Sequence, residues 1–190
     1  MEPIQNKSIW NASGIAGLIF GFIVFLITMI GSYITIHSEP SGSLFGANMI
    51  ASTVGCLIGV FGGAMGVKLY INQFGKELKI GKGALIGLAT GFFMAIISQI
   101  LSLLWPLIDG SFVNNLMEAM IANIELMEQL PSAQKQEMID ATYTQMQNYF
   151  AAGTIIKNLL IGVAMFGLLN MLSGMLAAKL MGEAPAEELL

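Results

Sequence analysis

Residues 83–108, GALIGLATGFFMAIISQILSLLWPLI, decide the fold, because this stretch contains no charged side chain. A helix needs about 20 residues to cross a hydrocarbon core of about 30 Å. Three other windows also lack Asp, Glu, Lys and Arg: 8–38, 40–67 and 158–178. Each window is long enough to span once, and helix is the default because lipid offers the backbone no hydrogen-bonding partner. We therefore predict an all-α polytopic membrane protein in one membrane domain, with spans near 12–36, 46–67, 83–107 and 158–179.

Composition excludes several classes of protein. Of the 190 residues, 55% are hydrophobic and only 11% are charged, whereas a soluble domain carries about 25% charge. A net charge of −4 without any arginine argues against binding to nucleic acid. The single cysteine, Cys56, cannot form an internal disulfide, and a single histidine, His37, argues against a histidine-ligated cofactor. We predict no catalytic, cofactor-binding or metal-binding residue, and hence no enzyme.

The lysines indicate an orientation in the membrane. One side of the predicted bundle carries six of them: Lys7, Lys68, Lys76, Lys79, Lys82 and Lys179. The other side carries Lys135 and Lys157. Because cytoplasmic loops are enriched in positive charge, we expect a bacterial inner-membrane protein with both termini and a short tail, 180–190, in the cytoplasm. The insert 109–157 then faces outward.

Glycine recurs at steps of four residues in three of the predicted spans. Small residues at this spacing form a groove in which a second helix backbone can approach closely. We predict helix packing at Gly17, Gly21, Gly55, Gly59, Gly63, Gly66, Gly83, Gly87 and Gly91. The grooves could serve packing within one chain, self-association or packing against other membrane-protein subunits, and the pattern leaves these alternatives open.

Among the polar residues of the spans, Gln99 and Asn170 lie at intermediate depth. They suit interhelical hydrogen bonds, and a polar transport path is the alternative. A short repeat favours that alternative, since Gly17-Leu18 and Gly21-Phe22 recur 70 positions later as Gly87-Leu88 and Gly91-Phe92. If the repeat reflects a duplication, the protein is built from two parallel helical hairpins, as some transporters are.

The insert 109–157 is predicted to form two amphipathic helices, near 112–129 and 132–152, separated by Pro131. The first has an apolar seam of Val113, Met117, Met120, Ile124 and Met127. The second has a seam of Ile139, Tyr143, Met146 and Phe150. The helices pair as a hairpin or lie on the membrane surface. Their acidic faces argue against anionic lipid and favour a partner protein or a self-packed cap.

One loop carries a resemblance to a known family. Lys68-Leu69-Tyr70 ends the second span, and Gly75 and Gly81-Lys82-Gly83-Ala84-Leu85 lead into the third. Together with the acidic insert, this order of parts resembles small four-span inner-membrane proteins of unknown function that are common in Bacteroidota. Ile71 and Ile80 depart from the family's usual arginine and aromatic residue. The resemblance implies an inner-membrane all-α protein and supplies no catalytic residue.

These features together favour a non-catalytic integral membrane subunit or scaffold that packs through its glycine-lined helices. In this hypothesis the outer helix pair is the docking surface, and the lipid bilayer and other subunits are the partners. The alternative is a small-solute transporter or channel, with Gln99 and Asn170 near the path.

Overall fold

The computed structural model describes residues 8–43 and 46–183, which fold into α-helices without a β-strand. The helices are α1 (Trp10–His37), α2 (Ala47–Gly59), α3 (Phe61–Phe74), α4 (Ile80–Ile108), α5 (Phe112–Glu125), α6 (Ser132–Gln147) and α7 (Ala152–Met181). Helices α2 and α3 follow one another as a single span interrupted at Val60. Four spans are therefore long and apolar enough to cross a membrane, which confirms the predicted fold class.

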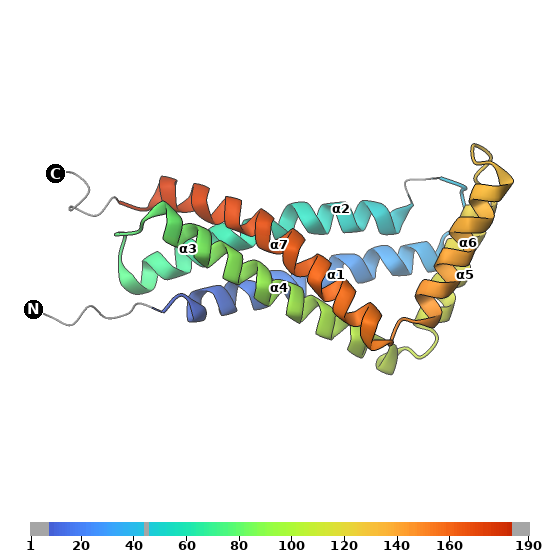
Figure 1. The fold of residues 1–190 in the computed structure, drawn as a ribbon, viewed down its shortest axis with the longest axis horizontal. Helices are drawn as coiled ribbons and strands as arrows, with labels where there is room; N and C mark the ends of the chain where they lie inside the picture. Colours follow the sequence, from blue (N-terminus) through green and yellow to red (C-terminus); the bar gives the residue numbers. More distant parts are fainter. Residues whose placement is uncertain (1–7, 44–45, 184–190) are drawn as a thin grey trace, which may run out of the picture.

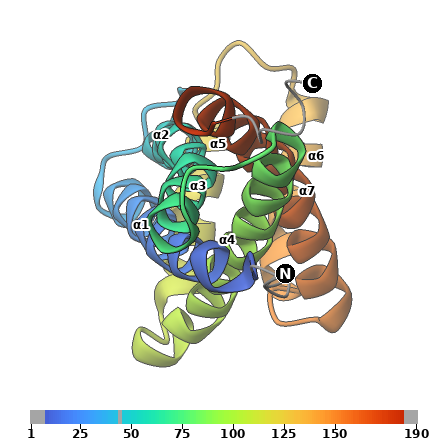
Figure 2. The same cartoon turned by 90° about the vertical axis from the view of Figure 1, so that its left-hand side faces the viewer.

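The four spans form an elongated bundle with α4 between α1 and α7 (Figures 1 and 2). Helix α3 packs against α1, α4 and α7, whereas α2 packs mainly against α1. Large apolar side chains cover the outside of the bundle, among them Leu18, Ile30, Leu57, Phe61, Leu107, Leu160, Leu168 and Leu176. This distribution suits a molecule whose surroundings are hydrocarbon, because apolar side chains lose nothing by facing lipid.

The helices extend beyond the predicted spans. The second span continues past Lys68 to Phe74, and the fourth begins at Ala152, six residues ahead of its predicted start. The side chains of Lys68 and Lys157 are exposed. Long basic side chains near helix ends can reach the polar interface while their backbone remains helical. A charge in the sequence therefore does not mark the end of the helix.

Helices α5 and α6 pair and lie across one end of the bundle (Figure 1). Proline at 131 separates them, and α6 starts at the following residue, where a fixed proline φ suits helix entry. Phe112 and Leu116 of α5 pack on Phe25 and Met29 of α1, which attaches the pair to the bundle. The two helices end at Glu125 and Gln147, earlier than predicted, because turns precede Pro131 and Ala152.

The opposite end is closed by the loop between α3 and α4. The Leu78 N–H donates to the Glu183 carbonyl, and the Glu183 N–H donates to the Lys76 carbonyl (3.3 and 2.9 Å). The start of α1 and the end of α7 both lie at this end (Figure 1). Within the predicted tail 180–190, α7 extends to Met181, and residues 184–190 lie outside the described part of the chain.

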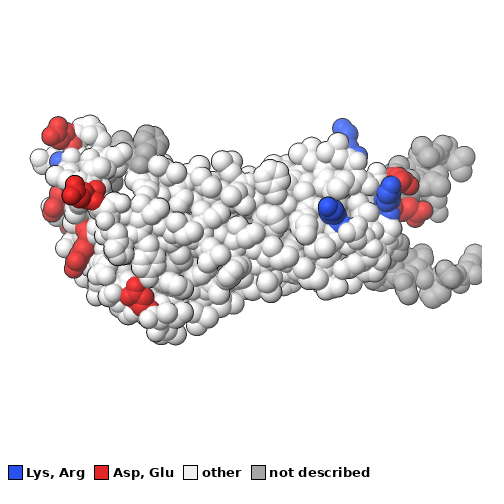
Figure 3. Space-filling model, turned by 180° about the vertical axis from the view of Figure 1, so that it is seen from behind, with Lys and Arg blue, Asp and Glu red and all other residues white. Residues whose placement is uncertain are grey.

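Charge differs between the two ends (Figure 3). We call residues 68–82 and 179–183 the lysine end; it contains Lys68, Lys76, Lys79, Lys82 and Lys179, with Glu77 and Glu183. We call residues 38–43 and 109–157 the hairpin end; it contains Glu39, Asp109, Glu118, Glu125, Glu128, Glu137 and Asp140, with Lys135 and Lys157. The described part of the molecule is thus positive at one end and negative at the other.

Candidate functional sites

The glycines of α4 lie directly against α7. A Cβ added at Gly87 would overlap the Asn170 carbonyl, and one added at Gly91 would overlap the Phe166 carbonyl. At Gly83 the added atom would lie 2.6 Å from the Gly174 carbonyl oxygen. These obstacles are backbone atoms, which cannot turn aside as a side chain can. The close approach of α4 and α7 therefore requires the absence of a side chain at these positions.

The other predicted packing glycines face different neighbours. Added Cβ atoms at Gly17 and Gly21 would lie 2.9 Å from the carbonyl oxygens of Thr90 and Met94 on α4. Those at Gly59 and Gly66 would lie 2.6 Å from Met94 Cε and Thr90 Oγ1, and one at Gly63 would overlap the Asn170 carbonyl. Gly55 has more room, with Ile27 and Val24 at 3.7 Å. Apart from Gly55, the structure places helices of the same chain closely against these glycines.

The matched glycines of the short repeat do not have equivalent neighbours. Gly17 and Gly21 of α1 face α4, but their counterparts Gly87 and Gly91 of α4 face α7. An axis relating two hairpins would place α1 and α4 in equivalent surroundings. The similarity of the two segments therefore does not extend to the contacts that their glycines make.

Asn170 forms a fully buried polar contact between the spans. Its side chain is fully buried, and its Oδ1 accepts a hydrogen bond from the backbone N–H of Gly63. Its Nδ2 donates to the Phe166 carbonyl at 2.9 Å and lies 4.0 Å from Met94 Sδ. The first N–H groups of a helix lack partners within that helix. Since α3 begins at Phe61, Asn170 provides the acceptor for Gly63 from a different helix.

Neighbouring hydroxyl groups are also paired. Ser13 of α1 donates to the Ile86 carbonyl at 3.1 Å, and Thr90 donates to the same carbonyl at 2.8 Å. Ser173 donates to the Asn170 carbonyl at 3.1 Å. Among the described residues no buried side-chain nitrogen or oxygen lacks a partner. The polar groups of this cluster therefore form hydrogen bonds within and between the helices.

Gln99 does not join this cluster. It is half-buried on α4, and its side chain forms no hydrogen bond with any described residue. Met94, which contacts Asn170, precedes Gln99 by five residues, or about 7.5 Å along the helix axis. The structure thus places the two predicted polar residues at different levels of the bundle.

A second cluster connects α1 to the start of the hairpin. Tyr33 donates from its hydroxyl to Asp109 Oδ2 at 2.7 Å, and Trp105 Nε1 donates to the Tyr33 hydroxyl at 3.1 Å. The other oxygen of Asp109 accepts from the N–H and the hydroxyl of Ser111. These bonds favour the carboxylate form, so the Tyr33 hydroxyl, followed by Ser111, lowers the pKa of Asp109.

This cluster predicts a pH effect on stability. Because the pKa of Asp109 is lower in the folded protein, its contribution is complete above the unfolded value of about 3.9 and is lost as the pH falls through the folded value. We expect the melting temperature in detergent to fall less between pH 6 and pH 3 in Asp109→Asn than in the unmodified protein. Asp140→Asn, at an exposed position of α6, is the control and should behave like the unmodified protein. Equal acid sensitivity in all three would contradict the assignment.

The apolar seams of the hairpin are buried unequally. Ile124 and Met127 are buried, and Val113, Met117 and Met120 are half-buried. In α6, Ile139 and Met146 are half-buried, whereas Tyr143 and Phe150 are 43% and 56% exposed. Helix α5 touches both α1 and α6, so its buried side also includes Phe112, Leu116 and Ile121. Helix α6 packs chiefly on α5, and most of its surface remains exposed.

Hydrogen bonds connect the loop after α1 to the hairpin, and the two helices of the hairpin to each other. The Ser41 N–H donates to Asn123 Oδ1 at 3.0 Å, and Lys135 donates to the Glu125 carbonyl at 2.9 Å. Gly42 has φ +65°, and a Cβ there would overlap the Leu126 carbonyl, so only glycine fits comfortably. The hairpin is thus held at α1, at this loop and at the end of α4.

Residues that carry the family resemblance come together at the lysine end. The Lys82 ammonium lies 4.9 Å from the centre of the Tyr70 ring, in a cation–π contact. Tyr70 is fully buried beside Phe74, Leu78 and Ile86. Within residues 8–43 and 46–183, no group of three or more His, Cys, Asp or Glu side chains is placed to hold a metal ion.

Comparison with known proteins identifies the family. The sequence model of the family described as "Protein of unknown function (DUF4199)" matches residues 15–179. No curated protein and no solved structure matches the chain significantly. The match runs from the first turns of α1 to the end of α7, which agrees with the expected resemblance to a family of unknown function. The chain therefore belongs to the DUF4199 family of proteins of unknown function.

Proposed function

We propose that this protein is a non-catalytic subunit or scaffold of a bacterial inner membrane, with the α5–α6 hairpin as its docking surface. The lysine end and both termini lie in the cytoplasm, and the hairpin lies outside. The charge difference between the two ends supports this orientation, since lysine is retained on the cytoplasmic side.

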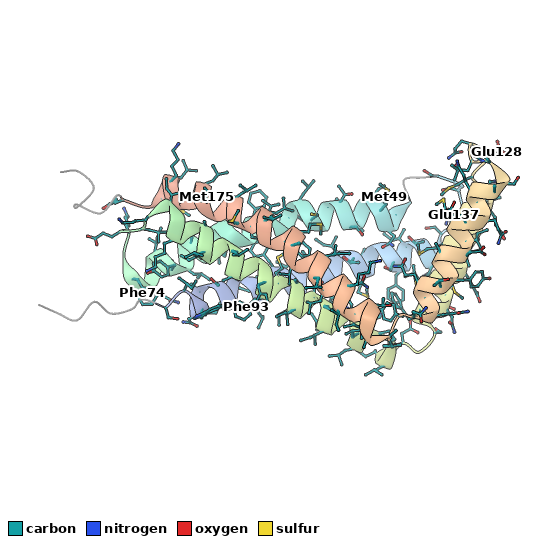
Figure 4. The ribbon with its side chains drawn as sticks, viewed as in Figure 1. Met49, Phe74, Phe93, Glu128, Glu137 and Met175 are labelled. Carbon is teal, nitrogen blue, oxygen red and sulfur yellow. The ribbon has the colours of Figure 1, made fainter. Side chains whose placement is uncertain are left out.

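The observation that carries the proposal is the exposed outer face of a firmly attached hairpin. Glu128 and Glu137 lie on the hairpin, at the far end of the molecule from Phe74 (Figure 4). Leu126 and Tyr143 are 53% and 43% exposed among these acidic residues. Large apolar or aromatic side chains within a polar rim are typical of surfaces that bind proteins. A protein partner with a basic rim fits this face.

The contacts of the glycines support a role for the hairpin rather than for the spans. Most of the predicted packing glycines already touch a helix of the same chain. Gly55 has more room than the others, but it too faces Ile27 and Val24 of α1, at 3.7 Å. A partner that used these grooves would have to displace helices of this protein, whereas the outer face of α6 is open.

Crosslinking from single cysteines tests both the orientation and the docking surface. In a Cys56→Ala background, Glu137→Cys places a thiol on α6, and the matched Glu77→Cys places one at the lysine end. We expect a membrane-impermeant thiol-reactive crosslinker to label Glu137→Cys in intact spheroplasts and to join it to a second polypeptide. Glu77→Cys should react only after the membrane is permeabilised.

Two results would contradict the proposal separately. Labelling of Glu77→Cys alone in intact spheroplasts would reverse the orientation. If Glu137→Cys in native membranes were labelled efficiently but gave no crosslinked product, the hairpin would not be a docking surface. The crosslinked product should also weaken when Tyr143→Ala is added, because the exposed ring is part of the proposed contact.

A further inference from the structure

An apolar groove lies on the outside of the bundle close to the lysine end. It has a volume of about 430 Å³ and is lined by Ile9 and Trp10, by Leu85, Leu88 and Phe92 of α4, and by Val163 of α7. Its walls are almost entirely apolar. The stretch of α4 from Leu85 to Phe92 extends about 10 Å along the helix axis. The groove therefore runs inward from the lysine end, along the direction in which an acyl chain enters a membrane.

Lys82, which stands one helical turn before the groove-lining residue Leu85, has no carboxylate partner among the described residues. Lys82 is half-buried, forms no ion pair with any described residue, and touches the Tyr70 ring. It precedes Leu85 by three residues, and side chains three apart are neighbours on a helix surface. Lys76, by contrast, is paired with Glu183 at 3.5 Å. A nearby anion stabilises a half-buried cation of this kind. Neither α3 nor α4 contains an Asp or Glu side chain that could be this anion.

Trp10 completes the arrangement. Its ring is 60% exposed and stacks edge-on against Phe93 at 6.1 Å, while its indole N–H has no partner among the described residues. Indole rings favour the level of lipid headgroups, where the N–H can donate to a phosphate or ester oxygen. Figure 4 shows Phe93 on α4, facing the α1 side of the bundle.

We infer that this groove binds a phospholipid with an anionic headgroup, seating one acyl chain against Leu85, Leu88 and Phe92 and its phosphate at Lys82. Lipid is the medium around the spans, so the acyl chain needs no separate source. The positive charge at the mouth selects the headgroup. A second apolar groove of about 250 Å³, lined by Ile27, Ile30, Ile34, Ile50 and Val54, lies between α1 and α2. Neither of these helices contains a lysine, so this groove should show no such preference.

Quenching of Trp10 by brominated lipid tests the inference. The protein with Trp105→Phe, which leaves Trp10 as its only tryptophan, is reconstituted in phosphatidylcholine vesicles containing chain-brominated phosphatidylglycerol or chain-brominated phosphatidylcholine. We expect phosphatidylglycerol to reach half-maximal quenching at an about fivefold lower fraction, the effect of about one lysine at a membrane surface. Native mass spectrometry of the unmodified protein should retain phosphatidylglycerol preferentially.

Substitutions at two lysines make the result specific. Lys82→Gln should abolish the fivefold preference, Lys82→Arg should keep it, and Lys76→Gln should keep it because Lys76 is exposed and already paired. Equal quenching by both lipids would overturn the inference. So would a preference that survives Lys82→Gln, or one that Lys76→Gln removes to the same extent, since the latter indicates only general surface charge.

Discussion

Replacement of Gly87 by valine is expected to destabilise the bundle by about 3 kcal/mol or more, because overpacking of a close contact costs about 1–3 kcal/mol and here the obstacle is backbone. The first added carbon would already overlap the Asn170 carbonyl, and it lies close to the Met171 Cα, at 3.0 Å. Relief requires α4 and α7 to separate, which would also pull Gly83 and Gly91 away from their contacts. Thermal unfolding in detergent, followed by circular dichroism, measures the loss.

Gly81 supplies the matched control on the same helix. A Cβ at Gly81 meets nothing within 4 Å, so Gly81→Val should change stability little. The stability of Gly87→Ala should fall between those of Gly87→Val and Gly81→Val, because alanine adds one carbon to glycine whereas valine adds three. If Gly87→Val and Gly81→Val unfolded at the same temperature, the contact between α4 and α7 would not depend on glycine.

Asn170→Leu is expected to cost about 2 kcal/mol, the second largest effect. The substitution removes the acceptor for the Gly63 N–H and the donor to Phe166 while keeping a side chain of similar size. An unpaired buried backbone group costs about 1–3 kcal/mol. Hydrogen bonds between membrane helices average only about 0.6 kcal/mol, so most of the loss should come from the unpaired N–H group.

The control for Asn170→Leu is Asn158→Leu, at an exposed position of the same helix. It should leave the unfolding midpoint almost unchanged. Amide hydrogen exchange gives a second measurement, because Asn170→Leu should accelerate exchange at Gly63. Unaltered exchange at Gly63 would show that this N–H does not depend on the side chain of Asn170.

Much of the fold could be predicted from the positions of the charged residues. Charge-free windows identified the four spans because lipid tolerates few charges in its hydrocarbon core. The same rule could not locate the helix ends, since Lys68 and Lys157 are compatible with helix where their side chains reach the interface. The interruption at Val60 also carries no clear signal, because glycine-rich stretches of α1 and α4 continue without a break.

The partners of the singled-out residues were harder to predict than the residues themselves. A carboxamide within an apolar window drew attention to Asn170, but its partner is a backbone N–H, a group that every residue except proline has. Tyr33 and Asp109 are 76 positions apart and belong to different elements, so no local spacing relates them. In the hairpin, the periodicity of α6 predicted an apolar seam, yet Tyr143 and Phe150 of that seam are exposed.

The bond between Asn170 and Gly63 has a consequence for how the protein is made. Its two halves are separated by 107 positions, so the interrupted second span leaves the ribosome long before its acceptor exists. At translation rates of about 5–20 residues per second, that delay lasts about 5–20 s. During this interval the Gly63 N–H needs a different acceptor, and the arrival of the last helix completes the assembly.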